Sequence, residues 1–288
     1  MFGLLNLNKP PGITSRAAVN RVQQCTGRIK IGHAGTLDPL ASGVLMICLG
    51  PATRLVDYVQ RMPKQYRGRF LLGRVSDTED IDGQVRELSN APQPAREQLE
   101  SVLPSFVGRI LQRPPAYSAV KVGGRRAYRL AREGTAVDLP TRPVEVYQIS
   151  LSRYCYPEFT LEIACGAGTY VRSLGRDIAI RLGTGAVMAE LTRTAIGDFR
   201  LDQAIRLDEL SAESLPERLL PAVSAVAHLP QVCLSARQRE RLLTGVTIEN
   251  QWGVCGGEIA AVDTTGRLCA LLAPTVGDRL RPARNFPP

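Results

Sequence analysis

Residues 32–43 have the sequence Gly32-His33-Ala34-Gly35-Thr36-Leu37-Asp38-Pro39-Leu40-Ala41-Ser42-Gly43, and the apolar run Val44–Leu49 follows directly. A continuous apolar run of this length is typical of a strand that is buried on both faces. The glycines before it tolerate positive φ and close approach of other atoms, so a loop is predicted there. Pro39 disfavours helical backbone at Asp38. The stretch therefore predicts a carboxylate on a glycine-rich loop beside a buried strand.

The local sequence leaves two interpretations of Asp38 open. The loop also carries the imidazole of His33 and the hydroxyl groups of Thr36 and Ser42, so it gathers groups that can take part in a reaction. An aspartate in such a segment can equally form an Asx-turn that only organises the loop. Local physics does not decide between the two.

A second glycine-rich junction, Gly166-Ala167-Gly168-Thr169, separates an alternating strand at 159–164 from a helix expected over 170–182. Tyr170 and Arg172 fall in the first turn of that helix. An arginine there can hold a carboxylate in a bidentate pair, although a surface arginine beside a packing tyrosine is the alternative. The glycines do not fit GxGxxG, and GxxxxGK[ST] is absent, so the sequence does not predict a nucleotide cofactor.

The remaining pattern mixes strands and helices without regular βαβ alternation. A helix is expected from a cap at Thr14 or Ser15 to about Gln24, and another after a cap at Thr53. Further strands are expected at residues 3–7, 44–49 and 66–72. This mixture predicts an α+β fold with a mainly antiparallel sheet.

The pattern weakens between about Pro216 and Pro230, which predicts a domain boundary. The domains expected are 1–228 and 229–288. In the second, Ser235 and Gln238 form a capping box for a short helix. Short apolar runs at 258–262 and 268–273 follow, so this part is predicted to be small and rich in β-structure.

The composition is basic, with a net charge of +9 over 288 residues and a pI of about 9.5. Such an excess favours a polyanionic partner, either nucleic acid or an anionic membrane surface, although a merely basic protein is possible on charge alone. One basic stretch contains two tyrosines, which suits an RNA backbone and unstacked bases, and a solvated helix face is the alternative. Its residues are Arg109, Arg113, Tyr117, Lys121, Arg125, Arg126, Tyr128, Arg129 and Arg132.

Several other site classes are disfavoured. The seven cysteines include no CxxC pair, and only two histidines are present, which argues against a disulfide scaffold and a zinc site. In the acidic stretch Asp77–Gly83, the calcium-loop register fails because Ser89 stands where a glutamate is required, so a solvated turn is expected. A run of about 18 apolar residues is absent, and the N-terminus lacks the pattern of a secretory signal. A cytoplasmic protein is expected.

The segment GHAGTLDPLASGVL resembles the signature loop of the TruB family of bacterial tRNA pseudouridine synthases. Further matching motifs follow the family's order along residues 3 to 200, which makes chance similarity a poor explanation. They are LNLNKPPGITS, CLGPATRL, KQYR, PPAYSAVKVGGRRAYRLAREG, GTYVRSLGRD and ELTRTAIGDF.

The resemblance implies an isomerase that converts uridine 55 in the T-loop of tRNA to pseudouridine, without cofactor or metal. It implies that Asp38 is the catalytic carboxylate and that Arg172 pairs with it. It implies substrate-binding roles for His33, which helps to extrude the nucleotide, for Tyr66, which stacks on the uracil, and for Tyr170 and Leu191, which line the base pocket. Lys9 and Pro10 match a structural pair under the loop. The RNA-binding residues expected are Arg54, Lys64, Lys121, Arg125, Arg126 and Arg129.

The implied fold is the pseudouridine synthase fold, an α+β architecture with a central, mainly antiparallel mixed sheet flanked by helices and loops. Residues 105–143 match an RNA-clasping insertion, and residues 229–288 resemble a shortened PUA-type RNA-binding domain. The implied partner is the T-arm of tRNA, with no membrane and no required protein partner. Nothing in the sequence demands more than a monomer.

The implied chemistry breaks the N-glycosidic bond and reattaches uracil through C5, which requires a flipped base. Attack of the carboxylate at ribose C1′ or at uracil C6 stays open, as does the base for the C5 proton, either Asp38 or the Tyr66 hydroxyl. Two competing functions remain: a dyskerin-type subunit that needs a guide RNA, and an RNA-binding or tRNA-folding factor whose catalysis is dispensable.

Overall fold

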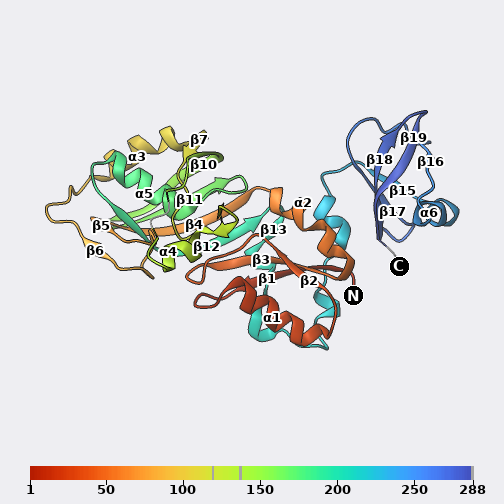
Figure 1. Ribbon diagram of the computed structural model, residues 1–288, viewed down its shortest axis with the longest axis horizontal. Coiled ribbons are helices and arrows are strands. Elements are labelled where there is room, and N and C mark those ends of the chain that lie inside the picture. The colour runs from red at the N-terminus through yellow and green to blue at the C-terminus, as the bar shows by residue number, and fades with distance from the viewer. Residues whose placement is uncertain (119, 136–137, 287–288) are drawn as a thin grey trace.

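The computed structural model describes residues 1–118, 120–135 and 138–286. Within these ranges, ten strands form one mixed sheet and five form a separate sheet at the other end of the elongated molecule (Figure 1). The large sheet has the order β14-β1-β3-β12-β4-β11-β10-β7, with β2 on β3 and β13 on β12. Its strands are β1 Gly3–Lys9, β2 Ile31–Ala34, β3 Ser42–Leu49, β4 Lys64–Leu72, β7 Gly108–Gln112, β10 Arg142–Cys155, β11 Glu158–Cys165, β12 Ala186–Ile196, β13 Phe199–Arg200 and β14 Ile205–Arg206.

The large sheet is mainly antiparallel, as predicted. Only the pairs β1–β14 and β3–β12 are parallel, while β4 runs antiparallel to both of its neighbours. The α-helices are α1 Ser15–Thr26, α2 Val56–Arg61, α3 Arg96–Val102, α4 Ala127–Arg132, α5 Val171–Arg181 and α6 Ala236–Leu243. The α+β fold class expected from the sequence is therefore confirmed.

Strand β3 is buried on both faces, as its continuous apolar sequence predicts. Leu45, Ile47 and Leu49 belong to one core cluster, to which α1, α3 and α5 also contribute. The alternate residues of β3 face a second cluster, built with the 3₁₀ helix η1 Gly50–Leu55 and α2. Side chains in a strand point alternately to opposite faces, so β3 ties the two cores together.

The helix boundaries follow the predicted caps with one exception. Thr14 accepts a hydrogen bond from the backbone of Ala17 at 3.0 Å and caps α1. The predicted cap at Thr53 is wrong, because its hydroxyl donates to the carbonyl of Gly50 at 2.8 Å inside η1. Helix α2 begins only at Val56. A short 3₁₀ turn therefore replaces the capped start.

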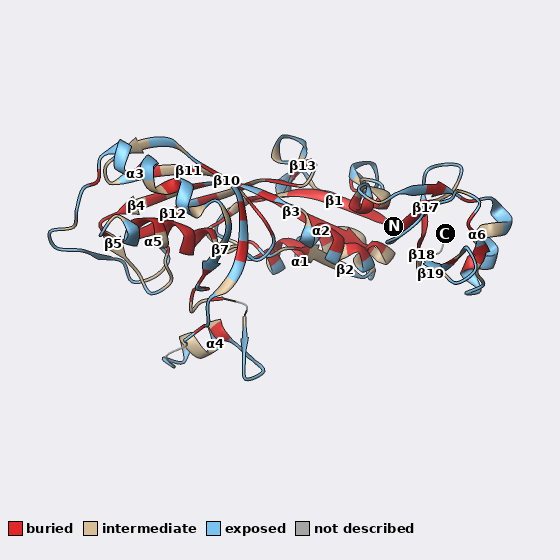
Figure 2. Cartoon of the chain, turned by 90° about the horizontal axis from the view of Figure 1, so that it is seen from above, coloured by how far each residue is buried: buried red, intermediate tan, exposed pale blue. Residues whose placement is uncertain are grey.

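The described residues between β7 and β10 form an arm that projects from the large sheet (Figure 2). It carries the short hairpin β8 Lys121–Val122 and β9 Arg125–Arg126, followed by α4. The hairpin was not predicted, and it presents both of its strands to solvent.

The five-stranded sheet has the order β15-β17-β18-β19-β16, and α6 lies beside it. Ser235 and Gln238 form the predicted capping box at the start of α6. The second core cluster joins this sheet to the large one, since Phe2 stacks on Phe286 with ring centroids 5.5 Å apart. The strands are β15 Gln231–Cys233, β16 Ile248–Glu249, β17 Ile259–Val262, β18 Leu268–Thr275 and β19 Arg279–Asn285.

The shorter elements complete the described chain. They are the hairpin β5 Arg74–Val75 and β6 Arg86–Glu87, and the 3₁₀ helices η2 Leu103–Phe106, η3 Leu201–Gln203, η4 Leu207–Glu209, η5 Pro216–Arg218 and η6 Ala222–Val226. Among the helices of the described ranges, none has the length and apolarity needed to cross a membrane.

Candidate active site

Asp38 lies on the loop between β2 and β3, directly above the end of β1. The ammonium group of Lys9, the last residue of β1, is fully buried under this loop. It donates to the carbonyls of Pro10 at 2.8 Å, Ile13 at 2.7 Å and Pro39 at 3.4 Å. Burial lowers the pKa of Lys9 to about 8, and the nearby Asp38 carboxylate opposes that shift. Lys9 therefore holds the loop from below, as the resemblance implies.

Ser15 fixes the backbone on the other side of Asp38. Its hydroxyl donates to the carbonyl of Leu37 and accepts from the Leu37 N–H, both at 2.8 Å. The N–H of Gly12 donates to Pro39 at 2.8 Å. The sequence suggested only that Ser15 might cap a helix. The backbone of both neighbours of Asp38 is thus held by hydrogen bonds, while 40% of the Asp38 side chain stays exposed.

Arg172, in the first turn of α5, joins Asp38 to a second carboxylate. Its Nη2 atom lies 3.1 Å from Oδ2 of Asp38 and donates to the carbonyl of Tyr117 at 3.2 Å. Its Nη1 atom donates to Oδ2 of Asp80 at 3.0 Å and to the carbonyl of Thr78 at 2.7 Å. Arg172 itself is only 5% exposed, and three hydrogen bonds together with the ion pair to Asp38 hold its guanidinium in a fixed orientation.

Burial and several charged groups act on the pKa of the Asp38 carboxyl, in addition to its ion pair with Arg172. Burial raises the pKa of the Asp38 carboxyl, and Arg172 and Lys9 oppose that rise. The carboxylates of Asp80 and Asp82 add to it by repulsion. Arg172 thus favours the ionised form, as its pairing implies, but it does not outweigh burial. The result is a carboxyl with a pKa above its ordinary value.

The acidic stretch 77–83 is not the solvated turn that was expected. Asp80 is 4% exposed, and its Oδ1 accepts from the Thr78 hydroxyl at 2.5 Å. Glu79 accepts from the hydroxyl of Ser173 at 2.6 Å and pairs with Arg176. Helix α5 supplies these partners from about 90 residues away, so the local acidity gave no sign of them. The exposed members are Asp77 and Asp82.

An apolar cluster beside Asp38 contains Tyr66 and Leu191. Tyr66 is 9% exposed on β4, and Leu191 is 7% exposed on the neighbouring strand β12. Both belong to the same core cluster as Leu37, the residue before Asp38. Burial raises the pKa of the Tyr66 hydroxyl, and the guanidinium of Arg193 opposes this. The structure therefore brings an aromatic ring and an aliphatic side chain to the base of the Asp38 loop.

His33 and Tyr170 lie at the edges of the site. His33 is half-buried on β2, and its Nδ1 is buried without a hydrogen-bond partner among the described residues. Burial lowers the pKa of His33, so the imidazole is neutral at pH 7. Tyr170 precedes α5, and its backbone N–H and carbonyl bond the buried amide of Gln112 at 2.8 and 3.0 Å. The guanidinium of Arg142 lies 5.0 Å from the Tyr170 ring centroid, within cation–π range.

Of the six expected RNA-binding residues, four lie on the projecting arm, one lies near the small sheet, and one is buried. Lys121, Arg125, Arg126 and Arg129 are exposed on the projecting arm, where Arg125 pairs with Glu133 at 2.6 Å. Arg54 is exposed far along the sheet and donates to the carbonyl of Asn285 at 2.7 Å.

Lys64, the sixth residue expected to bind RNA, is buried in this structure. Lys64 is 5% exposed, and its ammonium donates to the carbonyls of Gln60 and Met62. Burial lowers its pKa to about 8. Lys64 points inward because it lies on the β4 face that also buries Tyr66, two residues on.

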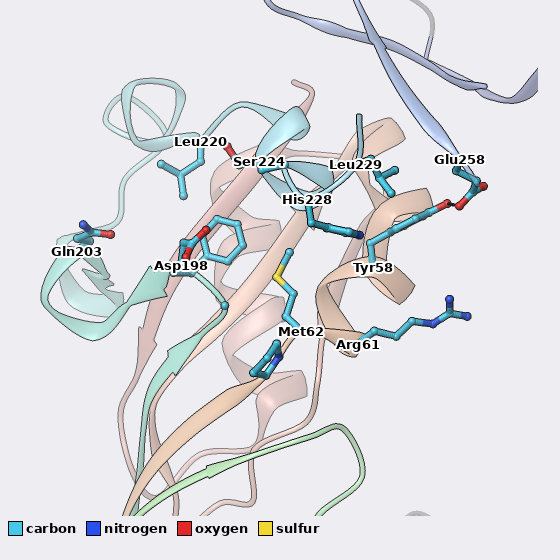
Figure 3. Close-up of a pocket in the computed structure, with 14 residues that line it drawn as sticks. Tyr58, Arg61, Met62, Asp198, Gln203, Leu220, Ser224, His228, Leu229 and Glu258 are labelled. Atoms are coloured by element: carbon cyan, nitrogen blue, oxygen red, sulfur yellow. Dashed lines mark hydrogen bonds between the residues drawn. The ribbon is translucent and has the colours of Figure 1, made fainter. Parts of the chain in front are cut away.

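The described residues contain no cluster of three or more His, Cys, Asp or Glu side chains placed to hold a metal ion. The seven cysteines are free thiols. A cavity of 730 Å³ lies elsewhere, between α2, the β12–β13 turn, η6 and the start of β17 (Figure 3). Its walls include Met62, Phe199 and Leu229. None of the residues that line it forms an ion pair or a hydrogen bond with the Asp38 side chain. This cavity is therefore a different place from the site that contains Asp38.

Two family models match consecutive parts of the chain. Residues 23–171 match the model described as TruB family pseudouridylate synthase, N-terminal domain. Residues 172–227 match the model described as tRNA pseudouridylate synthase B C-terminal domain. Together the two models include Asp38, Arg172 and both strands of the apolar cluster.

Curated relatives match most of the chain. A tRNA pseudouridine synthase B from Dehalococcoides mccartyi is 36% identical, with 99% of this chain and 97% of the relative covered. A protein of the same name from Acaryochloris marina is 46% identical over 76% of this chain and 75% of the relative. Among solved structures, the crystal structure of a Cbf5-Nop10-Gar1 complex contains a similar chain with a TM-score of 0.74 and 27% identity, covering 100% of this chain and 85% of that one.

Proposed function

Because the chain belongs to the TruB family of tRNA pseudouridine synthases, we propose that it isomerises uridine 55 in the T-loop of tRNA to pseudouridine, with Asp38 as the catalytic carboxylate. The single observation that carries the assignment is the half-exposed Asp38 carboxylate on a bonded loop, 3.1 Å from Arg172 and next to the Tyr66–Leu191 cluster. These groups supply a nucleophile and a place for a flat ring. Metal-ligand geometry is not required for either.

The target uridine must leave the stack of the T-loop before Asp38 reaches it. Tyr66 then stacks on the extruded uracil, an interaction that is worth about 1–3 kcal/mol for an aromatic side chain and a base. Leu191 packs on the same ring, and Tyr170 closes the pocket at the start of α5. His33 takes part in the extrusion as a neutral imidazole, since burial lowers its pKa.

The isomerisation breaks the C1′–N1 bond, forms the C1′–C5 bond, and moves a proton from C5 to a base while N1 gains one. The ionised Asp38 acts as the nucleophile. Attack at ribose C1′ and attack at uracil C6 are both compatible with its position. The C5 proton goes to Asp38 or to the oxygen of Tyr66; a neutral Tyr66 hydroxyl takes it only while releasing its own proton to water. Arg172 favours the ionised form of Asp38 by charge pairing, against the effect of burial.

We assign RNA binding to the basic residues of the arm, Lys121, Arg125, Arg126 and Arg129, with Arg54 as a contact nearer the small sheet. The net charge of +9 favours this polyanionic partner. We further propose that residues 1–228 form the catalytic domain and residues 229–288 a short PUA-like RNA-binding domain. The proposed enzyme works in the cytoplasm as a monomer, without cofactor or protein partner.

One observation favours an alternative. The fold also matches a chain from the crystal structure of a Cbf5-Nop10-Gar1 complex, an assembly of more than one named protein. A catalytic subunit that needs partners and a guide RNA would share this fold. Relatives that cover nearly the whole chain carry the name tRNA pseudouridine synthase B, which supports a stand-alone enzyme instead.

The test uses the purified full chain and an unmodified tRNA transcript, with pseudouridine mapped by position. Formation at uridine 55 by the protein alone supports the proposal. Formation only after addition of a guide RNA and partner proteins supports the alternative. Tight binding of tRNA with no pseudouridine at any position indicates an RNA-binding or tRNA-folding factor.

A further inference from the structure

Arg193 is the largest fully buried side chain of the described residues, at 1% exposure, and the chemistry above does not use it. It lies on β12, two residues after Leu191. Its three nitrogen atoms each have a different acceptor: Nε donates to the carbonyl of Val44 at 2.7 Å, Nη2 to the carbonyl of Gly35 at 3.0 Å, and Nη1 to the hydroxyl of Tyr66 at 3.5 Å.

Two of these acceptors lie on either side of Asp38 along the chain. Gly35 is the first residue after β2, and Val44 lies near the start of β3. The loop that carries Asp38 runs between them. One planar guanidinium therefore connects the two ends of the loop, with a geometry that a flexible ammonium does not reproduce.

The third acceptor connects the same group to the proposed stacking residue. Tyr66 is the Cα partner of Arg193 in the β4–β12 ladder, and the guanidinium carbon lies 6.0 Å from the Tyr66 ring centroid. The ring has its hydroxyl on Arg193 and its body in the apolar cluster. Arg193 thus contacts both the loop of the nucleophile and the ring of the stacking residue.

The backbone at this point allows little adjustment. Gly43 is the Cα partner of Arg193 in the parallel β3–β12 pair and has φ of +100°. A Cβ atom at Gly43 would lie 2.2 Å from the carbonyl oxygen of Arg193. The two strands approach so closely that only glycine fits, and this fixes the distance between Arg193 and the loop.

A buried cation is a costly way to join neutral groups. Within the described part of the chain, Arg193 forms no ion pair with a carboxylate. Its charge also disfavours the ionised forms of nearby Lys9 and Lys64. A hydrophobic side chain of similar volume is often as good for stability as a buried charge. A charge at this buried position points to a requirement for its three hydrogen bonds.

We propose that Arg193 is a positioning residue, which holds the Asp38 loop and the Tyr66 ring in one arrangement around the base to be isomerised. The inference rests on the proposed function, because it names what keeps the nucleophile and the stacking residue in register. Loss of the three bonds lets the loop and the ring shift separately. Misplacement by about 1 Å lowers the rate of an oriented reaction about 100-fold.

The experiment compares Arg193→Met and Arg193→Lys with a matched control, Ile196→Ala, in the full chain. Ile196 is fully buried on the same strand but belongs to the other core cluster. Each variant is assayed for thermal unfolding, for tRNA affinity, and for the single-turnover rate of pseudouridine formation at saturating enzyme. That rate is independent of any unfolded fraction, so it separates positioning from stability.

Arg193→Met is expected to bind tRNA within a few-fold of the parent and to react about 100-fold more slowly. Arg193→Lys is expected to recover part of the rate, because an ammonium reaches fewer of the three acceptors. Ile196→Ala is expected to melt at lower temperature and react at the parental rate. In a double-mutant cycle, Arg193→Met is expected to have a smaller effect when Tyr66 is already Phe.

A folded Arg193→Met that reacts at the parental rate overturns the inference. If Arg193→Met does not fold, Arg193→Lys decides: a slower reaction with retained binding supports positioning, and a parental rate contradicts it. An unmodified tRNA after incubation with the parent chain is a different result, since it overturns the proposed function itself.

Discussion

Asp80 and Arg172 form a buried ion pair in which Oδ2 of Asp80 lies 3.0 Å from Nη1 of Arg172, and each side chain is only 6% exposed. The same guanidinium reaches Asp38 with its other terminal nitrogen. The orientation of the residue that pairs with the proposed nucleophile is therefore set by a carboxylate outside the glycine-rich loop. Asp80 acts on Asp38 in two ways, through the position of Arg172 and by repulsion.

Replacement of Asp80 by Asn should slow the reaction while tRNA affinity stays close to that of the parent. Asn keeps the size and one acceptor, but Arg172 then has a single carboxylate partner and moves toward Asp38. We expect a decrease of about 10-fold to 100-fold in the single-turnover rate, as for other small displacements of reacting groups. Asp82→Asn is the matched control, because it also removes a carboxylate that repels Asp38 but leaves the ion pair between Asp80 and Arg172 in place. Equal rates for the two variants would contradict the role of Asp80.

The pH dependence of the reaction should report the Asp38 carboxyl. Burial raises the pKa of Asp38, so kcat/KM should increase with pH through a value above the ordinary aspartate pKa of about 3.9. Because the Asp80 carboxylate adds to that rise, Asp80→Asn should move the ascending limb to lower pH. The measurement is a pH profile of kcat/KM for both proteins. A limb that stays in place or moves to higher pH would contradict this effect of the Asp80 charge.

Asp38→Asn should be at least as stable as the parent at neutral pH. A carboxyl whose pKa is raised by folding contributes its full stabilisation below its unfolded pKa, and that contribution is lost as pH rises through the folded pKa. At pH 7 the ionised Asp38 is therefore unfavourable for folding. The neutral amide removes this effect, and Arg172 keeps Asp80 as its partner. Thermal unfolding of the two proteins at pH 7 and pH 4 tests the sign: the advantage of the amide should shrink at the lower pH.

Lys64 should affect stability rather than RNA binding. Burial lowers its folded pKa to about 8, so the unfolded chain binds more protons between about pH 8 and the ordinary lysine value of 10.5. Stability due to this group therefore rises with pH across that window. The difference in melting temperature between the parent and Lys64→Met should therefore change in favour of the parent as pH rises from 7.5 to 10. The salt dependence of tRNA binding should be the same in both, and a reduced slope in the variant would contradict the burial of Lys64.

The arm should supply the phosphate contacts that Lys64 does not. We expect Lys121→Gln to weaken tRNA binding and to reduce the slope of log affinity against log salt concentration by about 1 for the lost contact. Arg96→Gln, an exposed arginine of α3 that pairs with Glu100, is the control. The slopes come from fluorescence titrations between low and moderate salt. A parental slope in Lys121→Gln would argue against the arm as the RNA contact.

Elements with a strong local signal could be predicted from the sequence. The strand at 44–49 was predictable because every residue is apolar, and the helix at 236–243 because its capping box is local. The pairing of Asp38 with Arg172 was accessible only through the resemblance, since the two residues are 134 positions apart. Their contact depends on tertiary packing that no spacing rule describes.

Three features were missed for related reasons. Glu79 and Asp80 look like a solvated turn until α5 supplies their partners. Ser15 looks like a cap until the loop passes beside it. Arg193 did have a local signal: in the alternating pattern of β12 it takes an inward position between Leu191 and Ala195, both buried. A charged residue on the buried face of a strand indicates that hydrogen-bond partners surround it in the fold.

The proposed reaction depends most on the carboxylate at position 38, and one measurement tests that role directly. Purified Asp38→Asn and the parent chain are each incubated with the same unmodified tRNA transcript, and pseudouridine is quantified at position 55. We predict conversion by the parent and none by the variant, with tRNA bound equally well by both. Conversion at a comparable rate by the variant would contradict the assignment of Asp38.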